Sequence, residues 1–284
     1  MRVFTETIGE RATLTGYLSD ELPGNGSPRK RKAMVVLPGG GYVMLAPHEA
    51  EPVALAYSAH GYQTFILRYS LADDCVFPQA ESEVVRAIAF IRAHAEEYGI
   101  DPEKIAVCGF SAGGHLAAST GVHYAHPMVL ERAGVTASEG RPNGLVLIYP
   151  CITADEYGYP GIRALHGKGL APEVQDLLST EKYVTKDTPP TYLATTSTDT
   201  VVPSVNTLLF AMALAQAGVP YETHITRGGE HGMGLARDEF VWGDMAKMRE
   251  TDPEKYNRMH DIMRAFSVWV DESVHFLSGV FDGQ

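Results

Sequence analysis

A buried strand that turns sharply into a helix at a serine constrains this chain more than any other feature. Residues 105–108 are apolar throughout, which is typical of a fully buried strand, and a segment rich in Ala and Leu follows. Between them lies Gly109-Phe110-Ser111-Ala112-Gly113, a G-x-S-x-G motif. The two glycines allow the strand and the helix to approach closely, and the serine hydroxyl then stands above a helix N-terminus that favours negative charge. We interpret Ser111 as a nucleophile; the alternative for this motif alone is a helix entrance with a serine N-cap.

Apolar strands and helical segments alternate along the rest of the chain. All-apolar strands in this order predict a mainly parallel sheet with helices on both faces, an α/β fold of the doubly wound kind. No internal repeat or linker is evident, so we predict a single domain over residues 1–284. The expected strands are one or two antiparallel edge strands in 2–18, then 33–37, 62–69, 105–108, 144–149, 192–196 and 221–226, and the other expected helices are 48–60, 78–98, 204–217 and 258–277.

Two stretches lack a regular pattern that would place them in the sheet or its helices. Residues 151–190 contain several Gly, Pro and Tyr, and residues 235–257 are rich in charge. Because they follow expected strands, we predict that they form a small cap over the site. Residues 21–32 are predicted to be a loop that ends in a basic run beginning at Arg29, which we interpret as solvated.

A run of glycines follows the strand that ends at Leu37. Active sites in open parallel sheets lie beyond the carboxyl ends of the strands, so Pro38-Gly39-Gly40-Gly41-Tyr42 is expected at the site. Glycines let backbone N–H groups face a cleft, and we predict that the amides of Gly40, Gly41 and Ala112 stabilise an oxyanion. The alternatives are a flexible turn or a phosphate-binding loop. No G-K-[ST] sequence follows and no G-x-G-x-x-G is present, which argues against a nucleotide.

The ends of two later strands provide an acid and a base. Asp199 follows the strand that ends at Thr196, and His231 is framed by glycines after the strand that ends at Thr226. The order Ser111, Asp199, His231 is that of the α/β-hydrolase triad. Taken singly, Asp199 is also typical of a helix N-cap, and a surface position is the alternative we favour for the other histidines. His115 is expected to pack in the core, and His123 and His126 lack acidic partners at metal spacing.

The sequence resembles serine carboxylesterases of the α/β-hydrolase fold over about residues 33–235. It is similar both to hormone-sensitive-lipase-like esterases and to smaller acetyl-xylan and feruloyl esterase-like enzymes, through the glycine run, residues 101–107, residues 109–117 and the segments around Asp199 and His231. The lipase-like branch has a His before the glycine run, where this chain has Pro38. That branch also has a long N-terminal cap, whereas 32 residues precede the first apolar strand in this sequence. The resemblance therefore favours the compact branch, with an open, shallow pocket for a short acyl chain on a polar alcohol.

The resemblance also implies roles for the candidate residues. Ser111 would attack an ester carbonyl, His231 would accept its proton, and Asp199 would orient the imidazole. The expected substrate is a small-molecule ester, with an acetyl ester of a carbohydrate favoured, and the mechanism requires neither a metal nor an organic cofactor. Tyr42 is predicted to bind substrate. Tyr157, Tyr159 and Trp242 are aromatic candidates for a sugar-binding cleft, with packing under the loops as the alternative.

Two other functions remain open from the sequence. One is a peptidase or amidase of the prolyl-oligopeptidase type, which shares the triad but usually has a Tyr after the nucleophile, where this chain has Ala112. The other is a non-catalytic ligand receptor on the same fold, a class that typically loses the base. The presence of His231 argues against the receptor.

Charge and cysteine content narrow the class of partner. The 284 residues carry a formal net charge of −12, which argues against nucleic acid or an anionic membrane as a partner. Three cysteines without paired spacing, no apolar signal core and no apolar run of membrane-spanning length predict a cytoplasmic protein. Whether the chain forms a homo-oligomer is not determined by the sequence.

Overall fold

One sheet organises the computed structural model, which describes residues 1–20, 30–240 and 245–283. Within these residues the sheet has eight strands in the order β1-β2-β4-β3-β5-β6-β7-β8. The pairs β1–β2 and β2–β4 are antiparallel, and all other neighbouring pairs are parallel, as the sequence predicts. The strands are β1 (Arg2–Ile8), β2 (Ala12–Leu18), β3 (Arg31–Leu37), β4 (Gln63–Arg68), β5 (Ile100–Phe110), β6 (Gly144–Ile148), β7 (Thr191–Thr196) and β8 (Tyr221–Thr226).

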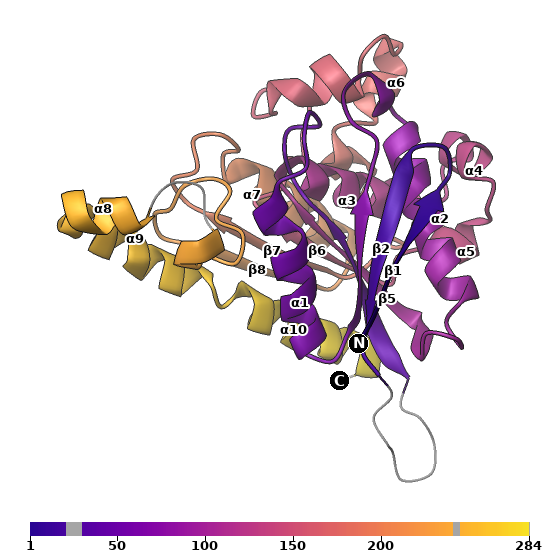
Figure 1. Cartoon of the computed structure of the whole chain (residues 1–284). Helices are drawn as coiled ribbons and strands as arrows, with labels where there is room; N and C mark the ends of the chain where they lie inside the picture. Colours follow the sequence, from indigo (N-terminus) through magenta and orange to yellow (C-terminus); the bar gives the residue numbers. More distant parts are fainter. Residues whose placement is uncertain (21–29, 241–244, 284) are drawn as a thin grey trace.

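Helices cover both faces of the sheet (Figure 1). The helices α1 (Glu51–Ala59), α9 (Pro253–Phe266) and α10 (Trp269–Asp282) pack on one face, and α2 (Gln79–Ala93), α3 (Ser111–His123) and α7 (Val205–Ala217) on the other. The shorter elements are α4 (Pro127–Ala133), α5 (Ala137–Gly140), α6 (Pro172–Asp176), α8 (Met245–Thr251), the 3-10 helices η1 (Pro47–Glu49), η2 (Ala72–Asp74), η4 (Thr180–Tyr183) and η5 (Asp238–Phe240), and the π-helix η3 (Ile162–His166).

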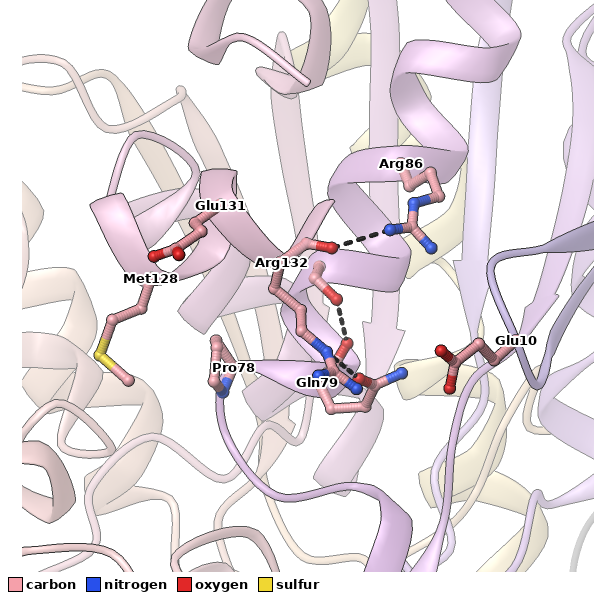
Figure 2. Close-up of a pocket in the computed structure, with 8 residues that line it drawn as sticks. Glu10, Pro78, Gln79, Arg86, Met128, Glu131 and Arg132 are labelled. Carbon is pink, nitrogen blue, oxygen red and sulfur yellow. Dashed lines mark hydrogen bonds between the residues drawn. The ribbon is translucent and has the colours of Figure 1, made fainter. Parts of the chain in front are cut away.

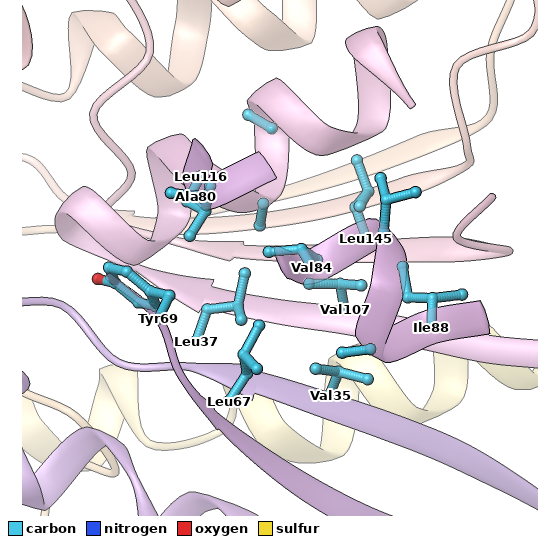
Figure 3. Close-up of a cluster of buried hydrophobic side chains, with 14 of the residues drawn as sticks. Val35, Leu37, Leu67, Tyr69, Ala80, Val84, Ile88, Val107, Leu116 and Leu145 are labelled. Atoms are coloured by element: carbon cyan, nitrogen blue, oxygen red, sulfur yellow. The ribbon is translucent and has the colours of Figure 1, made fainter. Parts of the chain in front are cut away.

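The period-two alternation of strand side chains divides the core into two layers. Val35 and Leu37 point toward α2, where Figure 3 shows them beside Val84. Met34 and Val36, which alternate with them, belong to the cluster on the opposite face. All are fully buried, and burying each such side chain contributes about 1.5–3 kcal/mol. This two-sided burial explains why residues 33–37 of β3 are apolar throughout.

Two predicted helices have different bounds in the structure. The helix expected over 78–98 ends at Ala93, and the chain continues in turns to Gly99, which has a φ of 63°. The helix expected over 258–277 is two helices, α9 and α10. The hydroxyl of Ser267 donates to the carbonyl of Arg264 at 3.1 Å, and such local side-chain bonds compete with regular helical bonding.

The carboxyl ends of the parallel strands share one edge of the sheet, and the segment 151–190 lies at that edge. In Figure 1, α6 and its neighbours lie at the end of the molecule opposite the N-terminus. The segment contains η3, α6 and η4, so it is more helical than its sequence suggests. Of the second expected cap segment, α8 packs against α9, and residues 241–244, which include Trp242, lie outside the described residues. Most of the predicted loop 21–32 lies outside them too, and Arg31 and Lys32 begin β3.

No helix among residues 1–20, 30–240 and 245–283 combines the length and the apolar character that a membrane crossing requires.

Candidate active site

Ser111 occupies the tight turn that the sequence predicts between β5 and α3. Its φ is 52°, in the left-handed region that a residue with a side chain rarely adopts. A Cβ on Gly113 would lie 2.3 Å from the carbonyl oxygen of Leu37, and one on Gly109 would lie 2.2 Å from the carbonyl oxygen of Gly113. Only glycine fits either position, so both glycines are required by the close approach of α3 to the strands.

Ser111, His231 and Asp199 form one chain of hydrogen bonds. Ser111 Oγ and His231 Nε2 are 2.8 Å apart, and His231 Nδ1 and Asp199 Oδ2 are 2.6 Å apart. The second oxygen of Asp199 accepts the amides of Val201 and Val202, each at 2.9 Å. An ionised Asp199 only accepts hydrogen bonds, so Nδ1 carries the imidazole proton and Nε2 is free to accept from the serine hydroxyl. The structure thus brings the three predicted residues together in the geometry of a nucleophile, a base and its orienting acid.

The glycine run lies beside the tight turn at Ser111, and two of its backbone torsions favour glycine. Gly40 has a φ of 127° and Gly41 a φ of 64°, and a Cβ on Gly40 would lie 2.2 Å from the carbonyl oxygen of Met44. The amide of Ala112 belongs to the first turn of α3, where N–H groups have no intrahelical acceptor. The three amides predicted as oxyanion donors therefore lie on an open loop and at a helix N-terminus, and their catalytic role stays a prediction.

A buried glutamate that the sequence analysis missed connects this loop to the histidine loop. Glu49 is 2% exposed, and its Oε2 accepts the amide of Gly39 at 2.8 Å. Its Oε1 accepts the hydroxyl of Tyr149 at 2.6 Å, and that hydroxyl accepts the amide of Gly234 at 2.9 Å. The ring of Tyr149 packs edge-on against that of His231, with centroids 4.9 Å apart.

The electrostatics of this link follow from burial. Burial, reinforced by the neighbouring Glu49 carboxylate, raises the pKa of Tyr149 well above its usual range, so its hydroxyl keeps the proton that it donates to Glu49. Tyr149 has a φ of 37°, an unfavourable value for a residue with a side chain. Glu49 lies within the predicted helix 48–60, at the end of the 3-10 helix η1, and no motif marks it. Its role is visible only once the two loops are placed in space.

Tyr42 corrects one prediction. Its side chain is fully buried, and its hydroxyl lies 2.9 Å from His115 Nδ1, so the side chain lies in the core and does not contact substrate in this arrangement. His115 is buried against it, as the sequence predicts. The surface position favoured for the remaining histidines is wrong for His123, which is 3% exposed, and for His166, which is fully buried and stacks on Tyr42 with ring centroids 4.6 Å apart.

The aromatic candidates differ in position. Tyr157 is exposed, whereas the Tyr159 hydroxyl lies 2.9 Å from the position that a Cβ on Gly41 would occupy. Tyr159 therefore lies directly beside the predicted oxyanion loop. Val43 and Val201, which lie close to site residues in the sequence, have exposed apolar side chains.

A separate hollow lies away from these residues (Figure 2). It has a volume of about 460 Å³ and is bordered by the start of α2, by α4 and by Glu10. The Arg132 guanidinium there donates to Gln79 Oε1, and Arg86 donates to backbone carbonyls. Its two arginines are thus bonded to a side-chain amide and to backbone carbonyls, and none of the predicted site residues borders it. Among the described residues, no group of three or more His, Cys, Asp or Glu is arranged to hold a metal ion.

Comparison with known proteins agrees with this geometry. Residues 22–214 match the BD-FAE family. The chain is 37% identical over 218 residues to endo-1,4-beta-xylanase B of Butyrivibrio fibrisolvens, a match that covers 75% of this chain and 34% of the relative. It is 31% identical over 222 residues to acetylxylan esterase of Xylanibacter ruminicola, covering 75% of this chain and 43% of the relative. The chain thus spans less than half the length of these two curated relatives.

A solved structure gives a fuller match. The acetyl ester-xyloside bifunctional hydrolase of Caldicellulosiruptor lactoaceticus superposes with a TM-score of 0.70 and 36% identity, covering 89% of this chain and 90% of that one. The match over nearly the whole of both chains supports the fold assignment made from the sequence.

Proposed function

Since this chain belongs to the BD-FAE family of α/β-hydrolases, we propose that it is a serine carboxylesterase that removes short acyl groups, acetyl first among them, from carbohydrate esters. The observation that carries the proposal is the continuous hydrogen-bonded chain Ser111–His231–Asp199 at the carboxyl edge of the sheet. The names of the relatives, an acetylxylan esterase and an acetyl ester-xyloside hydrolase, support the substrate class.

Acylation begins at the Ser111 hydroxyl. His231 Nε2 accepts the hydroxyl proton as Ser111 Oγ bonds to the ester carbonyl carbon, and the imidazolium that forms is stabilised by Asp199. The carbonyl oxygen becomes an oxyanion, to which the amides of Gly40, Gly41 and Ala112 donate hydrogen bonds. Removing one such donor typically lowers kcat by about 10²–10³-fold. His231 then protonates the leaving alcohol as the carbon–oxygen bond breaks, which leaves an acyl-Ser111 ester.

Deacylation repeats these steps with water. His231 takes a proton from water as the oxygen attacks the acyl carbon, and it returns that proton to Ser111 Oγ when the acid leaves. The free enzyme is regenerated with each proton accounted for.

The surroundings of the glycine loop support a short acyl group. Ser111 is 8% exposed, and the Tyr159 hydroxyl stands close over Gly41. Little space therefore remains beside the donor loop, which suits a methyl group better than a long alkyl chain. The exposed Tyr157 lies two residues before Tyr159, and we infer that its ring is available to a sugar ring of the substrate.

The proposal is tested by comparing esters of one leaving group with sugar esters. We expect nitrophenyl acetate to be hydrolysed faster than the butyrate, and the octanoate slowest, together with release of acetate from acetylated xylo-oligosaccharides. The Ser111→Ala variant is the control and should lose all of these activities while remaining folded. A butyrate optimum without acetate release would move the protein to the general carboxylesterases, and faster cleavage of an aminoacyl anilide would indicate an amidase.

The three cysteines support a location in a reducing compartment as part of the same proposal. Cys75, Cys108 and Cys151 are all buried and unpaired, and the cytoplasm is the compartment that we propose.

A further inference from the structure

A second carboxylate–histidine pair lies buried next to the predicted oxyanion loop. Glu81 of α2 and His166 of η3 are both fully buried, and Glu81 Oε1 lies 2.8 Å from His166 Nε2. The same oxygen accepts the hydroxyl of Ser119 at 2.7 Å. His166 Nδ1 lies 2.7 Å from the carbonyl oxygen of Cys75.

The partners of His166 determine its charge. Both ring nitrogens face atoms that only accept hydrogen bonds, so both must carry a proton. Burial alone would lower the pKa of His166, but the Glu81 carboxylate and, after it, the side chain of Cys75 outweigh burial and raise that pKa. For Glu81, burial is likewise outweighed by His166 and Ser119, which lower its pKa. The pair is therefore an imidazolium and a carboxylate.

Tyr42 connects this ion pair to the glycine loop. Its ring lies flat on the His166 imidazolium, at 4.6 Å and an interplanar angle of 8°. Its hydroxyl donates to Nδ1 of His115, whose Nε2 donates to the carbonyl of Leu178 at 2.9 Å. Burial and the neighbouring His166 charge lower the pKa of His115 to about 4, which keeps it neutral and able to accept from Tyr42.

The backbone of this loop needs such an anchor. Gly40, Gly41 and Tyr42 have successive φ values of 127°, 64° and 63°. Glycines do not hold such a conformation by themselves, and Tyr42 adopts it against the preference of a residue with a side chain. The Tyr42 side chain is fixed by its ring and by its hydroxyl, and its carbonyl accepts the amide of Ala72 at 2.7 Å.

We propose that Glu81, His166, His115 and Tyr42 form a positioning network that fixes the direction of the Gly40 and Gly41 amides toward Ser111. The network acts through the backbone and touches no substrate atom. It also joins four parts of the chain. Glu81 belongs to α2, His166 to the 151–190 segment, His115 to the helix that follows the nucleophile, and Tyr42 to the donor loop. The inference rests on the proposed role of those amides as oxyanion donors.

The chain provides a matched pair of variants for the test. His115 and His123 are both buried on α3. The Nε2 atom of His115 is hydrogen-bonded to the carbonyl of Leu178, and that of His123 to the carbonyl of the neighbouring Leu177. Only His115 is bonded to Tyr42. The test variants are His115→Gln, Tyr42→Phe and Glu81→Gln, and His123→Gln is the control. Tyr42→Phe keeps the stacked ring and removes one hydroxyl, so it is the variant least prone to misfold.

The assay measures catalysis per functional site. A fluorophosphonate titrates the reactive serine, nitrophenyl acetate gives kcat and KM per titrated site, and a trifluoromethyl ketone, which forms a tetrahedral adduct with serine, gives an inhibition constant. Because displacement of a positioned group by about 1 Å costs up to about 10²-fold, we expect the three test variants to lose about 10-fold or more in kcat. KM should stay within about twofold, and the inhibition constant should rise in parallel with the loss of kcat.

A merely structural role gives a different result. Partial unfolding lowers the number of titrated sites and leaves kcat per site and the inhibition constant unchanged. The proposal is overturned if Tyr42→Phe and His115→Gln keep kcat per site within twofold of the parent, or if His123→Gln loses as much as His115→Gln. If Ser111→Ala retains hydrolysis, the proposed function itself fails, which is distinct from failure of the network alone.

Discussion

Two carboxylate–imidazole pairs in this molecule differ in what faces the second ring nitrogen. In the Asp199–His231 pair that nitrogen faces the Ser111 hydroxyl, which donates a proton as readily as it accepts one. In the Glu81–His166 pair it faces a backbone carbonyl, which only accepts. His231 therefore retains a site for a proton and has the geometry of a base, whereas His166 already carries both protons and has no such site.

The surroundings of the two pairs reinforce this difference. The His231 side chain is 16% exposed, within reach of a substrate, and both residues of the other pair are 0% exposed. A carboxylate beside a histidine is thus not a sufficient sign of catalysis. The group that faces the second ring nitrogen of the histidine, together with access to solvent, distinguishes a reactive pair from a structural one.

The largest effect is expected from breaking the Asp199–His231 pair by Asp199→Asn. The amide group would donate to His231 Nδ1, place the proton on Nε2, and so remove the acceptor for the Ser111 proton. We predict a loss of about 10⁴-fold in kcat with nitrophenyl acetate at neutral pH. The unfolding midpoint in urea should change little, because the side-chain oxygen of Asn can still accept the amides of Val201 and Val202.

Breaking the Glu81–His166 pair by Glu81→Gln should reduce stability more than Asp199→Asn does. The imidazolium of His166 would lose its carboxylate, and removing one partner of a buried ion pair typically costs about 3–5 kcal/mol of unfolding free energy. Urea unfolding followed by circular dichroism measures this loss. Equal stabilities of Glu81→Gln and the parent protein would show that His166 is not charged.

The pH dependence of stability sharpens the comparison. Because the pKa of folded His166 is raised above its ordinary value of 6.5, its contribution is fully present below about pH 6.5 and is lost as the pH rises toward the folded pKa. The Glu81 contribution, whose pKa is lowered, is lost only in acid, as the pH falls below about 4.5. His115 has a pKa of about 4 in the folded protein. Between about pH 6.5 and 4 it therefore binds a proton only in the unfolded chain, which destabilises the fold in that range.

The measurement compares the parent with the Glu81→Leu/His166→Leu double variant. The unfolding free energy of the parent minus that of the double variant should decrease by up to about 1.4 kcal/mol for each pH unit between pH 7 and 9. A difference that is constant over this range would contradict the charged pair.

The smallest effect is expected at the link between the two loops of the active site. Tyr149→Phe keeps the ring beside His231 and removes the hydroxyl that joins Glu49 to the Gly234 amide. We predict a loss of about 1–3 kcal/mol in unfolding free energy, because buried partners lose a hydrogen bond, and a decrease in kcat of several-fold. Phe266, which stacks on the same ring, provides a control through Phe266→Leu, which should reduce stability with less effect on kcat per titrated site.

The comparison also shows what can be predicted from this sequence. Ser111, Asp199 and His231 each follow a predicted strand, so the strand pattern places them at one edge of the sheet. The same pattern predicts the order and type of the main strands and helices. These features are local, since a strand end or a G-x-S-x-G turn is specified within about ten residues.

The features that the sequence analysis missed depend on contacts between distant segments. Glu49 reaches Tyr149, 100 residues away, and Glu81 reaches His166, 85 residues away, with no motif at either end. Tyr42 is predicted to bind substrate, but its side chain is fully buried and bonds to His115, 73 residues away. The irregular 151–190 segment gave no period from which the burial of His166 could be predicted.

The most direct test of the central claim, acyl transfer through Ser111, is mass spectrometry of the protein after reaction with a fluorophosphonate. We predict a single adduct on the peptide that contains Ser111, no adduct in Ser111→Ala, and much slower labelling in Asp199→Asn, because only a serine activated by His231 reacts rapidly. An adduct on another residue, or ester hydrolysis that persists in Ser111→Ala, would contradict the account.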